Sequence, residues 1–242
     1  MVAVITGAGK GIGKAVALRL AQDGYKIAVC YKNSESAADS TVSDIIFKGG
    51  TASAFPLDVT DSKNVNSVIS EIEKSFGEID VLVNNAGIAE QSLFTDITDE
   101  MWQKMIDTNL SGAFYCSRAV LPFMIHRKKG KIINIASIWG ETGGSCEVHY
   151  SAAKAGIIGM TKALAKEVGP SGITVNCVSP GVILTDMTAH FDADTMNGLK
   201  YETPLGRIGT PEDIAGAVSF LASADASFIT GQDIAVNGGM NI

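Results

Sequence analysis

Short, almost uninterrupted apolar runs alternate along this chain with longer segments in which apolar residues recur every three or four positions. The short runs lack the polar alternation of a strand with one wet face, so they predict strands that are covered on both faces. The longer segments predict amphipathic helices. The expected strands are residues 2–5, 26–31, 52–55, 79–84, 131–137, 173–179 and 232–238, and the expected helices are residues 12–23, 35–48, 62–76, 99–127, 150–168 and 212–223.

The regular order of strands and helices predicts the fold. Helical crossovers between successive strands are typical of parallel sheets, so we expect an α/β fold: a Rossmann-type doubly wound sheet of seven parallel strands with helices on both faces. No linker, repeat or low-complexity segment interrupts the sequence, which predicts a single domain over residues 1–242. Residues 182–205 form a long polar stretch after the sixth strand. We expect an irregular substrate-binding loop or lid there, with a plain connection as the alternative.

A glycine-rich turn, TGAGKGIG at residues 6–13, joins the first strand to the first helix. Its glycines, Gly7, Gly11 and Gly13, follow the pattern T-G-x-x-x-G-x-G rather than G-x-G-x-x-G. Glycine permits positive φ and lets backbone approach a pyrophosphate, while the helix N-terminus offers free N–H groups. The turn therefore predicts a dinucleotide site.

The end of the second strand bears on which nicotinamide coenzyme binds. Residues 29–33, VCYKN, lack the carboxylate that would hydrogen-bond a ribose 2′-hydroxyl and repel a 2′-phosphate. Lys10 in the glycine turn and Lys32 after the strand would both attract such a phosphate, which favours NADPH. The alternative for Lys32 is an ordinary solvated loop charge.

Two further segments predict contacts with the adenosine half of the coenzyme. Asp58 follows the third strand, where it could accept a hydrogen bond from the adenine amino group. Its alternative role is a helix N-cap, although Thr60 or Asp61 fits that role better. NNAG at residues 84–87 follows the fourth strand, and Gly87 would let backbone lie against the adenine ribose.

Composition narrows the classes of partner. Lys and Arg number 19 against 26 Asp and Glu, and the net charge of −7 argues against nucleic acid as the main partner. The N-terminus does not read as a signal peptide, and no apolar run approaches the ~20 residues of a membrane span, so we expect a soluble, cytoplasmic protein. The cysteines have neither paired nor metal-site spacing, which predicts free thiols in a reducing compartment and no metal. They are Cys30, Cys116, Cys146 and Cys177.

YSAAK at residues 150–154 places a phenol and an amine one helical turn apart on the same face. A free phenol has a pKa of ~10, and a nearby ammonium lowers a pKa by roughly 1–3 units. The pair therefore predicts that Tyr150 donates a proton with the help of Lys154, against the alternative that Tyr150 packs and Lys154 faces water. His149 is not a candidate base, because its helix neighbour points roughly 100° away.

Several motifs follow one another in a fixed order: TGxxxGxG at residues 6–13, NNAG at 84–87, Asn109, Ser137, YxxxK at 150–154 and Pro-Gly at 180–181. Together they resemble the short-chain dehydrogenase/reductase superfamily. Residues 180–188, 204–223 and 229–240 resemble more closely its 3-oxoacyl-[acyl-carrier-protein] reductases. The resemblance implies NADPH-dependent reduction of a 3-oxoacyl thioester to the 3-hydroxyacyl form in fatty-acid biosynthesis.

The resemblance also implies roles for individual residues. Tyr150 would donate the proton, Lys154 would hold the nicotinamide ribose, and Ser137 would bind the carbonyl oxygen. Asn109 would bend its helix and hold a water that links the lysine to solvent. The implied coenzyme-binding residues are Gly7, Gly9, Lys10, Gly11, Ile12, Gly13, Lys32, Asp58, Val59, Asn85, Ala86, Gly87, Tyr150, Lys154, Pro180, Gly181, Ile183 and Thr185.

The family also implies a homotetramer with D₂ symmetry. Small residues on one face of the helix at 150–168 would let a partner helix approach closely, although they could instead fit against the sheet. An acidic carrier protein would dock on basic residues, and residues 126–131 offer such a patch, expected at the active-site rim. The patch holds Arg127, Lys128 and Lys129, and the small residues are Ala152, Ala155, Gly156 and Gly159.

Other features leave the substrate open. Ser171 stands before GITVN at residues 172–176, where related reductases often have a basic residue. Trp139 and the pair Cys146-Glu147 are unexpected in a common carrier-protein reductase and are similar to a branch that reduces an aminopentanone group on elongation factor P. Acetoacetyl-CoA and sugar or polyol ketones remain alternatives. A non-catalytic NADP-binding sensor is a further one, against which the intact catalytic residues argue.

Overall fold

Seven parallel strands form one sheet at the centre of the computed structural model, which describes residues 1–189 and 191–241. The strand order is β3-β2-β1-β4-β5-β6-β7, so the chain winds outward in both directions from β1 and β4. This confirms the predicted doubly wound parallel sheet. The strands are β1 (Val2–Thr6), β2 (Lys26–Tyr31), β3 (Thr51–Pro56), β4 (Ile79–Asn84), β5 (Gly130–Ile135), β6 (Ile173–Pro180) and β7 (Asp233–Val236).

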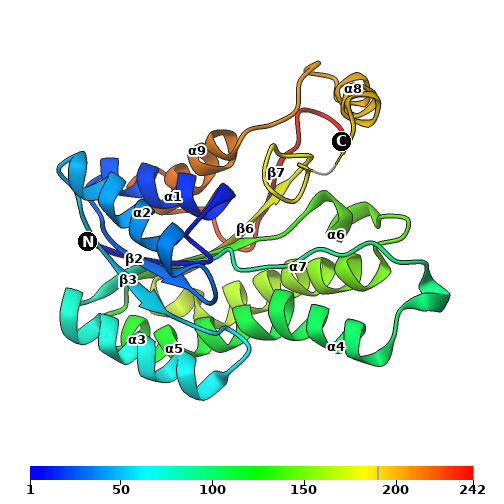
Figure 1. The fold of residues 1–242 in the computed structure, drawn as a ribbon. Helices are drawn as coiled ribbons and strands as arrows, with labels where there is room; N and C mark the ends of the chain where they lie inside the picture. Colours follow the sequence, from blue (N-terminus) through cyan, green and yellow to red (C-terminus); the bar gives the residue numbers. More distant parts are fainter. Residues whose placement is uncertain (190, 242) are drawn as a thin grey trace.

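Helices cover both faces of the sheet (Figure 1). One face carries α1 (Gly11–Gln22), α2 (Glu35–Phe47) and α9 (Pro211–Ala222), and the other carries α3 (Ser62–Phe76), α4 (Asp99–Ile106), α5 (Gly112–Arg127) and α7 (Val148–Val168). Each face has its own apolar core because successive strand side chains point to opposite faces. Within β1, Ile5 packs toward α1 and α9, whereas Val4 packs toward α3 and α5. None of the described helices combines the length and the apolar character that crossing a membrane requires.

The helix expected at residues 99–127 is not regular. It divides into α4 and α5, joined by one turn of π geometry at Asp107–Ser111. Asn109 lies within this turn, and its side chain hydrogen-bonds the backbone of Ile88 in the loop after β4. The interruption lies at the position where the resemblance implied a bent helix, and a distant partner accompanies it.

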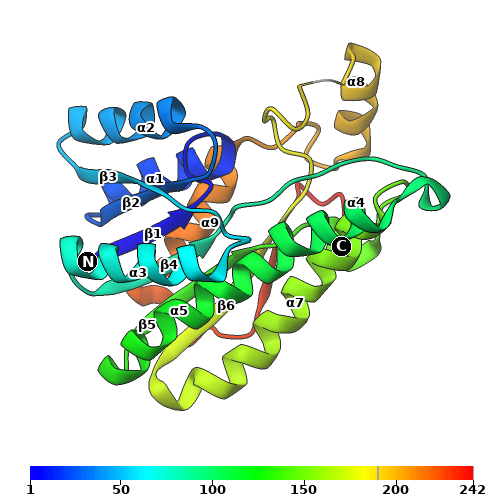
Figure 2. The same cartoon turned by 60° about the horizontal axis from the view of Figure 1, so that its bottom comes forward.

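Two segments at the carboxyl edge of the sheet differ from expectation. The expected strand at 131–137 ends earlier, at Ile135, because Ser137 caps the short helix α6 (Ile138–Thr142). Residues 182–205 are not wholly irregular, since helix α8 (Ala193–Glu202) projects from the body there (Figures 1 and 2). Asp192 caps α8 by accepting a hydrogen bond from the Thr195 N–H at 2.8 Å. Residue 190 of the predicted lid, like residue 242 of the predicted domain, lies outside the described residues.

Candidate functional site

The glycine turn is clamped to the loop that follows β4. The Thr6 hydroxyl oxygen accepts hydrogen bonds from the N–H groups of Asn85 and Ala86 at 3.0 and 2.9 Å. In return, the Asn85 amide donates to the carbonyls of Thr6 and Gly7 at 2.9 and 3.1 Å. The predicted coenzyme residues of two strands are therefore held together at the centre of the carboxyl edge.

The turn has the shape that a bound pyrophosphate requires. Gly7 and Gly11 adopt φ of +65° and +54°, which favours glycine. A Cβ on Gly13 would lie 2.3 Å from the Gly7 carbonyl oxygen, so no side chain fits at that position. Lys10 precedes α1 in an extended conformation and forms no side-chain cap, so the first N–H groups of this helix remain available to an anion. These residues fit the phosphates of a nicotinamide coenzyme.

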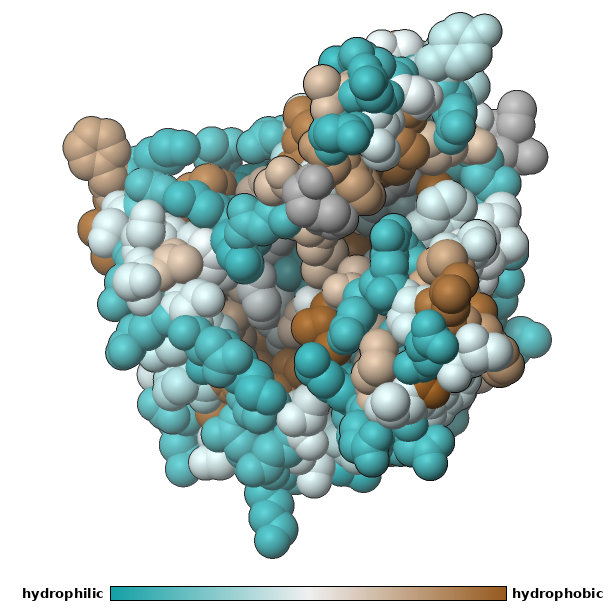
Figure 3. Space-filling view, turned by 45° about the vertical axis from the view of Figure 1, so that its right-hand side comes forward, coloured by the Kyte–Doolittle hydropathy of each residue, from teal (hydrophilic) through white to brown (hydrophobic). Residues whose placement is uncertain are grey.

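A cavity of about 350 Å³ lies at the carboxyl edge of the sheet, where β2 and β3 end. Its size suits a nucleoside-sized group. Figure 3 shows that the molecule is hollowed below the projecting α8 segment. The walls include the predicted residues Lys32, Asp58 and Val59. Sequence reasoning missed the remaining wall residues, several of which reach the cavity only because α4 and the π turn fold across it: Asn33, Thr60, Ile88, Lys104, Asp107 and Thr108.

Lys32 and Asp58, predicted to bind separate parts of the coenzyme, contact each other. Lys32 Nζ lies 2.7 Å from Asp58 Oδ2, and Asp58 Oδ1 accepts hydrogen bonds from the Thr60 N–H and hydroxyl. Burial would raise the pKa of Asp58, but the bonds from Lys32 and Thr60 outweigh it and lower the pKa. The helix cap is Asp61, not Asp58, since Asp61 accepts from the first N–H groups of α3. Asp58 is therefore a fixed carboxylate in the cavity wall.

The base of the lid segment adjoins the glycine turn. Lys10 Nζ pairs with Asp186 Oδ2 at 2.8 Å, and a Cβ on Gly11 would meet the Thr185 methyl group at 3.5 Å. Gly181 continues from β6 and donates its N–H to the Val236 carbonyl at 3.1 Å. The predicted coenzyme residues that follow β6 thus lie next to those that follow β1.

Ser137, Tyr150 and Lys154 meet beside this turn, at the carboxyl end of β5. Ser137 is buried and caps α6 by accepting the Trp139 N–H at 3.2 Å. Lys154, 5% exposed, donates from Nζ to the Ile135 carbonyl at 2.8 Å. Its Nζ also lies 5.6 Å from the centroid of the Tyr150 ring. The structure thus assembles the three residues, and Lys154 does not face water.

The protonation of the pair differs from the sequence-based expectation. We expected Lys154 to lower the pKa of Tyr150, and that expectation is wrong for this structure. Burial raises the pKa of Tyr150 to about 12; the Ser137 hydroxyl lowers it and the Glu147 carboxylate raises it further. Burial also lowers the pKa of Lys154 to about 8. Lys154 Nζ donates its hydrogen bond to the Ile135 carbonyl, and desolvation of the phenolate dominates the pKa of Tyr150.

Asn109 is close to the same cluster. Its Oδ1 accepts from the Ile88 N–H at 3.1 Å, and its Nδ2 donates to the carbonyls of Ile88 and Met105 at 3.0 and 3.1 Å. A Cβ on Gly87 would lie 2.6 Å from Asn109 Oδ1 and 3.7 Å from Lys154 Nζ. Gly87 therefore lies between Asn109 and Lys154, and its lack of a side chain lets them approach each other.

His149 precedes Tyr150 on α7 but is packed differently. Its side chain is fully buried, and neither ring nitrogen has a hydrogen-bond partner among the described residues. One helical turn after His149 comes Ala153, whereas one helical turn after Tyr150 comes Lys154. Adjacent residues thus occupy different faces of the helix.

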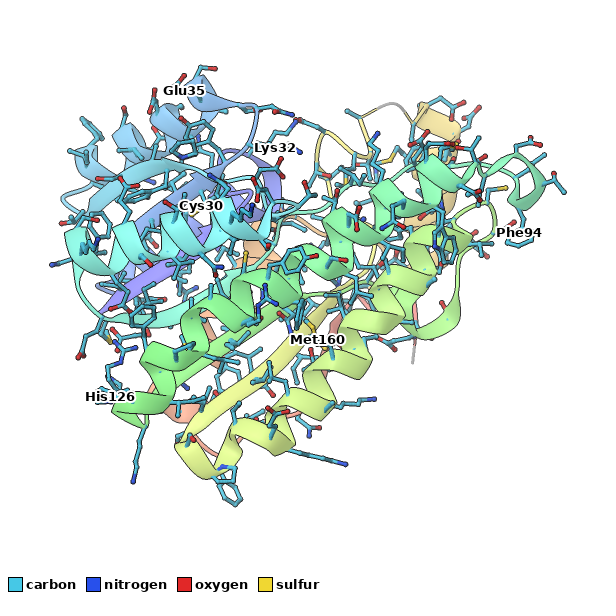
Figure 4. The ribbon with its side chains drawn as sticks, turned by 90° about the horizontal axis from the view of Figure 1, so that it is seen from below. Cys30, Lys32, Glu35, Phe94, His126 and Met160 are labelled. Carbon is cyan, nitrogen blue, oxygen red and sulfur yellow. The ribbon has the colours of Figure 1, made fainter. Side chains whose placement is uncertain are left out.

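The basic patch is not at the rim of the site. Residues 126–131 precede and begin β5, whereas the site lies where β5 ends, about 20 Å away along a six-residue strand. Arg127 lies 3.5 Å from Glu78, and Lys129 pairs with Asp80 at 3.0 Å, at the amino end of β4. Figure 4 shows His126 at one end of the molecule and Phe94 at the other. The expectation of a patch at the rim is therefore wrong.

The small residues of α7 divide into two groups. Ala152, Ala155 and Gly159 are exposed, and a Cβ on Gly159 would meet open space. Gly156 instead packs within the chain, because a Cβ there would lie 2.7 Å from the Leu110 side chain in the π turn. In Figure 4, Met160 lies on the face where α7 runs beside α5. An exposed surface of small residues therefore remains on this side of the molecule.

Known proteins resemble this chain over almost its whole length. The family model described as enoyl-(acyl carrier protein) reductase matches residues 7–241. The 3-oxoacyl-[acyl-carrier-protein] reductase of Synechocystis is 48% identical over 99% of this chain and 96% of its own length. The Escherichia coli K12 reductase of the same name, FabG, is 45% identical over 99% of this chain and 96% of its own length. FabG of Staphylococcus aureus is 44% identical over 98% of this chain and 97% of its own.

A solved structure has the same fold. The crystal structure of a putative gluconate dehydrogenase from Agrobacterium tumefaciens superposes with a TM-score of 0.96 at 34% sequence identity. The match covers 99% of this chain and 95% of that one. Relatives of different reported substrate therefore share this architecture.

Proposed function

This chain belongs to the short-chain dehydrogenase/reductase family of oxidoreductases, and from that premise we propose that it reduces a 3-oxoacyl-[acyl-carrier-protein] to the 3-hydroxyacyl form with NADPH. The observation that carries the proposal is the meeting of Ser137, Tyr150 and buried Lys154 beside the glycine turn. The substrate is taken from curated relatives at 44% to 48% identity that carry this name.

The chain's own residues account for the proton half of a ketone reduction. The nicotinamide supplies the hydride to the carbonyl carbon when the coenzyme is bound. With its pKa at about 12, Tyr150 is protonated at neutral pH and can donate to the carbonyl oxygen as negative charge develops there. The Ser137 hydroxyl lies against Tyr150 and would hydrogen-bond the same oxygen. Lys154 would hold the ribose and stabilise the tyrosinate that remains.

A carrier-protein substrate is tested by a screen of ketones. We expect NADPH oxidation to be faster with acetoacetyl-[acyl-carrier-protein] than with acetoacetyl-CoA at the same concentration, and slow with sugar ketones. Steady-state kcat/KM values would be compared for each substrate. Turnover of a sugar ketone but neither thioester would contradict the proposed substrate and favour the sugar and polyol alternative.

For the coenzyme, we propose NADPH, supported by two cations and the lack of an acidic residue at positions 29–33, where β2 ends. Lys10 and Lys32 each pair with an exposed or half-exposed carboxylate, and exposed pairs contribute little, so a phosphate can replace those partners.

Lys10→Ala is therefore expected to weaken NADPH binding by about ten-fold and to leave NADH nearly unchanged, since a charged hydrogen bond contributes about 1.5–3 kcal/mol. Dissociation constants for both coenzymes would be measured by titration. Lys74→Ala, which removes the same charge from the exposed face of α3, is the matched control. Equal affinity of the parent protein for the two coenzymes would contradict the phosphate argument.

We also propose that residues 182–205 close over the substrate and that the exposed face of α5 and α7 forms a subunit interface in a D₂ homotetramer. Ala152, Ala155 and Gly159 support the second proposal, because small exposed residues let helices approach closely. The mass in solution tests it, and a monomer at micromolar concentration would contradict it. A carrier protein on the basic patch would lie far from the carbonyl site of the same protomer.

A further inference from the structure

Two loops form a wall next to the carbonyl site. The Ser92 N–H donates to the Cys146 carbonyl at 2.8 Å, and Gln91 Nε2 donates to Glu147 Oε1 at 3.2 Å. The loop that holds Gln91 and Ser92 follows β4, and the loop that holds Cys146 and Glu147 precedes α7. These bonds hold the loop before α7 in a defined position, although Cys146 adopts a φ of +61° that is unusual for a residue with a side chain.

Glu147 is the charged residue of this wall. It precedes Tyr150 by three positions, at the start of α7, where residues three apart are neighbours about 5–6 Å apart between Cβ atoms. Its backbone carbonyl begins the helix by accepting from the Ser151 N–H at 2.8 Å, and its side chain forms no cap bond. The carboxylate instead accepts its hydrogen bond from Gln91, on the other loop of the wall.

The charge of Glu147 is not neutralised. Its partner is the neutral amide of Gln91, and the ion pairs among residues 1–189 and 191–241 do not include it. The side chain is half-buried, where an effective dielectric near 20 leaves charges strongly coupled over several ångströms. The raised pKa of Tyr150 has Glu147 among its causes, which agrees with this proximity.

We propose that Glu147 determines specificity by charge: it disfavours ketones that carry a carboxylate near the carbonyl and admits neutral thioesters or cationic ketones. This inference rests on the proposed ketone reduction at Tyr150. A substrate carboxylate in the site would lie next to the Glu147 carboxylate, and two like charges at such a distance repel. A 3-oxoacyl thioester has no charge near its carbonyl and escapes the penalty.

The proposal bears on the substrate for which a structural neighbour is named. The putative gluconate dehydrogenase is named for a sugar acid, whose carboxylate is ionised at neutral pH. The Glu147 carboxylate, which has no cationic partner in an ion pair within the described part of the chain, would repel the carboxylate of a sugar acid. In this chain, charge at the wall would therefore select among substrates that a shared fold could accept.

The test compares two small ketones that differ mainly in charge, acetoacetate and methyl acetoacetate. For the parent enzyme we expect kcat/KM to be higher for the neutral ester. In Glu147→Gln the value for acetoacetate should rise on the order of ten-fold, while the ester value changes little, because only the anion loses a repulsion. Added salt should narrow the preference in the parent enzyme and have less effect in Glu147→Gln.

Two further variants distinguish charge from structure. Glu147→Asp keeps the charge and should keep the preference for the ester, whereas Glu71→Gln removes the same charge from α3 and should change neither value. The proposal would be overturned if Glu147→Gln left the ratio of the two kcat/KM values unchanged. It would also be overturned if kcat/KM fell equally for both ketones. If the ester preference behaves as expected but acetoacetyl-[acyl-carrier-protein] is not reduced, the proposed substrate fails and the role of Glu147 stands.

Discussion

Replacement of Tyr150 by Phe is expected to lower kcat for ketone reduction by ~10²–10⁴-fold, the usual contribution of a positioned general acid. The phenol is half-buried beside Ser137 and keeps its proton at neutral pH, since its pKa lies at about 12. Phenylalanine fills the same space without a proton to donate. Steady-state rates of NADPH oxidation with a 3-oxoacyl thioester would measure the loss, and titration of the variant with NADPH should give nearly the parent affinity.

Tyr115→Phe is the matched control, because it removes the same hydroxyl from a half-buried tyrosine in the first turn of α5, which is not among the residues of the carbonyl site. It should retain nearly the parent rate. A Tyr150→Phe enzyme that works within a few-fold of the parent would remove Tyr150 from the role of proton donor.

Substitution of Lys154 by Met is expected to have two opposite effects. Activity should fall at least 10²-fold, because the coenzyme ribose and the tyrosinate lose their cation. Stability should improve relative to the parent at neutral pH, because the protein must bury the ammonium: burial lowers the pKa of Lys154 from 10.5 to about 8. That shift corresponds to roughly 3 kcal/mol at 1.36 kcal/mol per unit, offset by about 1–3 kcal/mol for the lost bond to Ile135.

The pH dependence of stability separates these two contributions. Between pH 8 and pH 10.5 the unfolded chain holds the Lys154 proton and the folded chain has lost it, so the parent's free energy of unfolding rises with pH. The variant lacks this titration. Subtracting its curve, measured by urea unfolding, from the parent's should leave a rise of roughly 3 kcal/mol over that interval. Parallel curves would mean that the amine is not held in a desolvated site.

Local pattern was sufficient where a short segment determines its own structure. The apolar run that became β1 and the glycines of the turn after it require no distant partner to be recognised. The helix α8 was missed because none of its residues is buried, so it carries no apolar stripe, and Gly198 lowers its helix propensity. The cap residue Asp192 was the one local signal that could have revealed it.

Distant partners account for the other differences. Lys32 and Asp58 come from separate strands, and their pairing depends on β2 lying beside β3. The π turn at Asn109 depends on the Ile88 backbone in the same way. The pKa of Tyr150 was predicted from its neighbour on the helix, but burial by the rest of the fold outweighs that neighbour. Such contributions depend on how the whole domain folds.

The most direct test of the central claim is a label-transfer measurement. The claim is that this chain reduces the ketone of a 3-oxoacyl thioester at Tyr150. The enzyme would be incubated with NADPH deuterated at the transferable position and acetoacetyl-[acyl-carrier-protein], and the product analysed by mass spectrometry. The account predicts a 3-hydroxybutyryl product with one deuterium on its carbinol carbon, formed by the parent enzyme and not by Tyr150→Phe in the same time. Unreduced substrate with the parent enzyme, or equal product from both proteins, would contradict it.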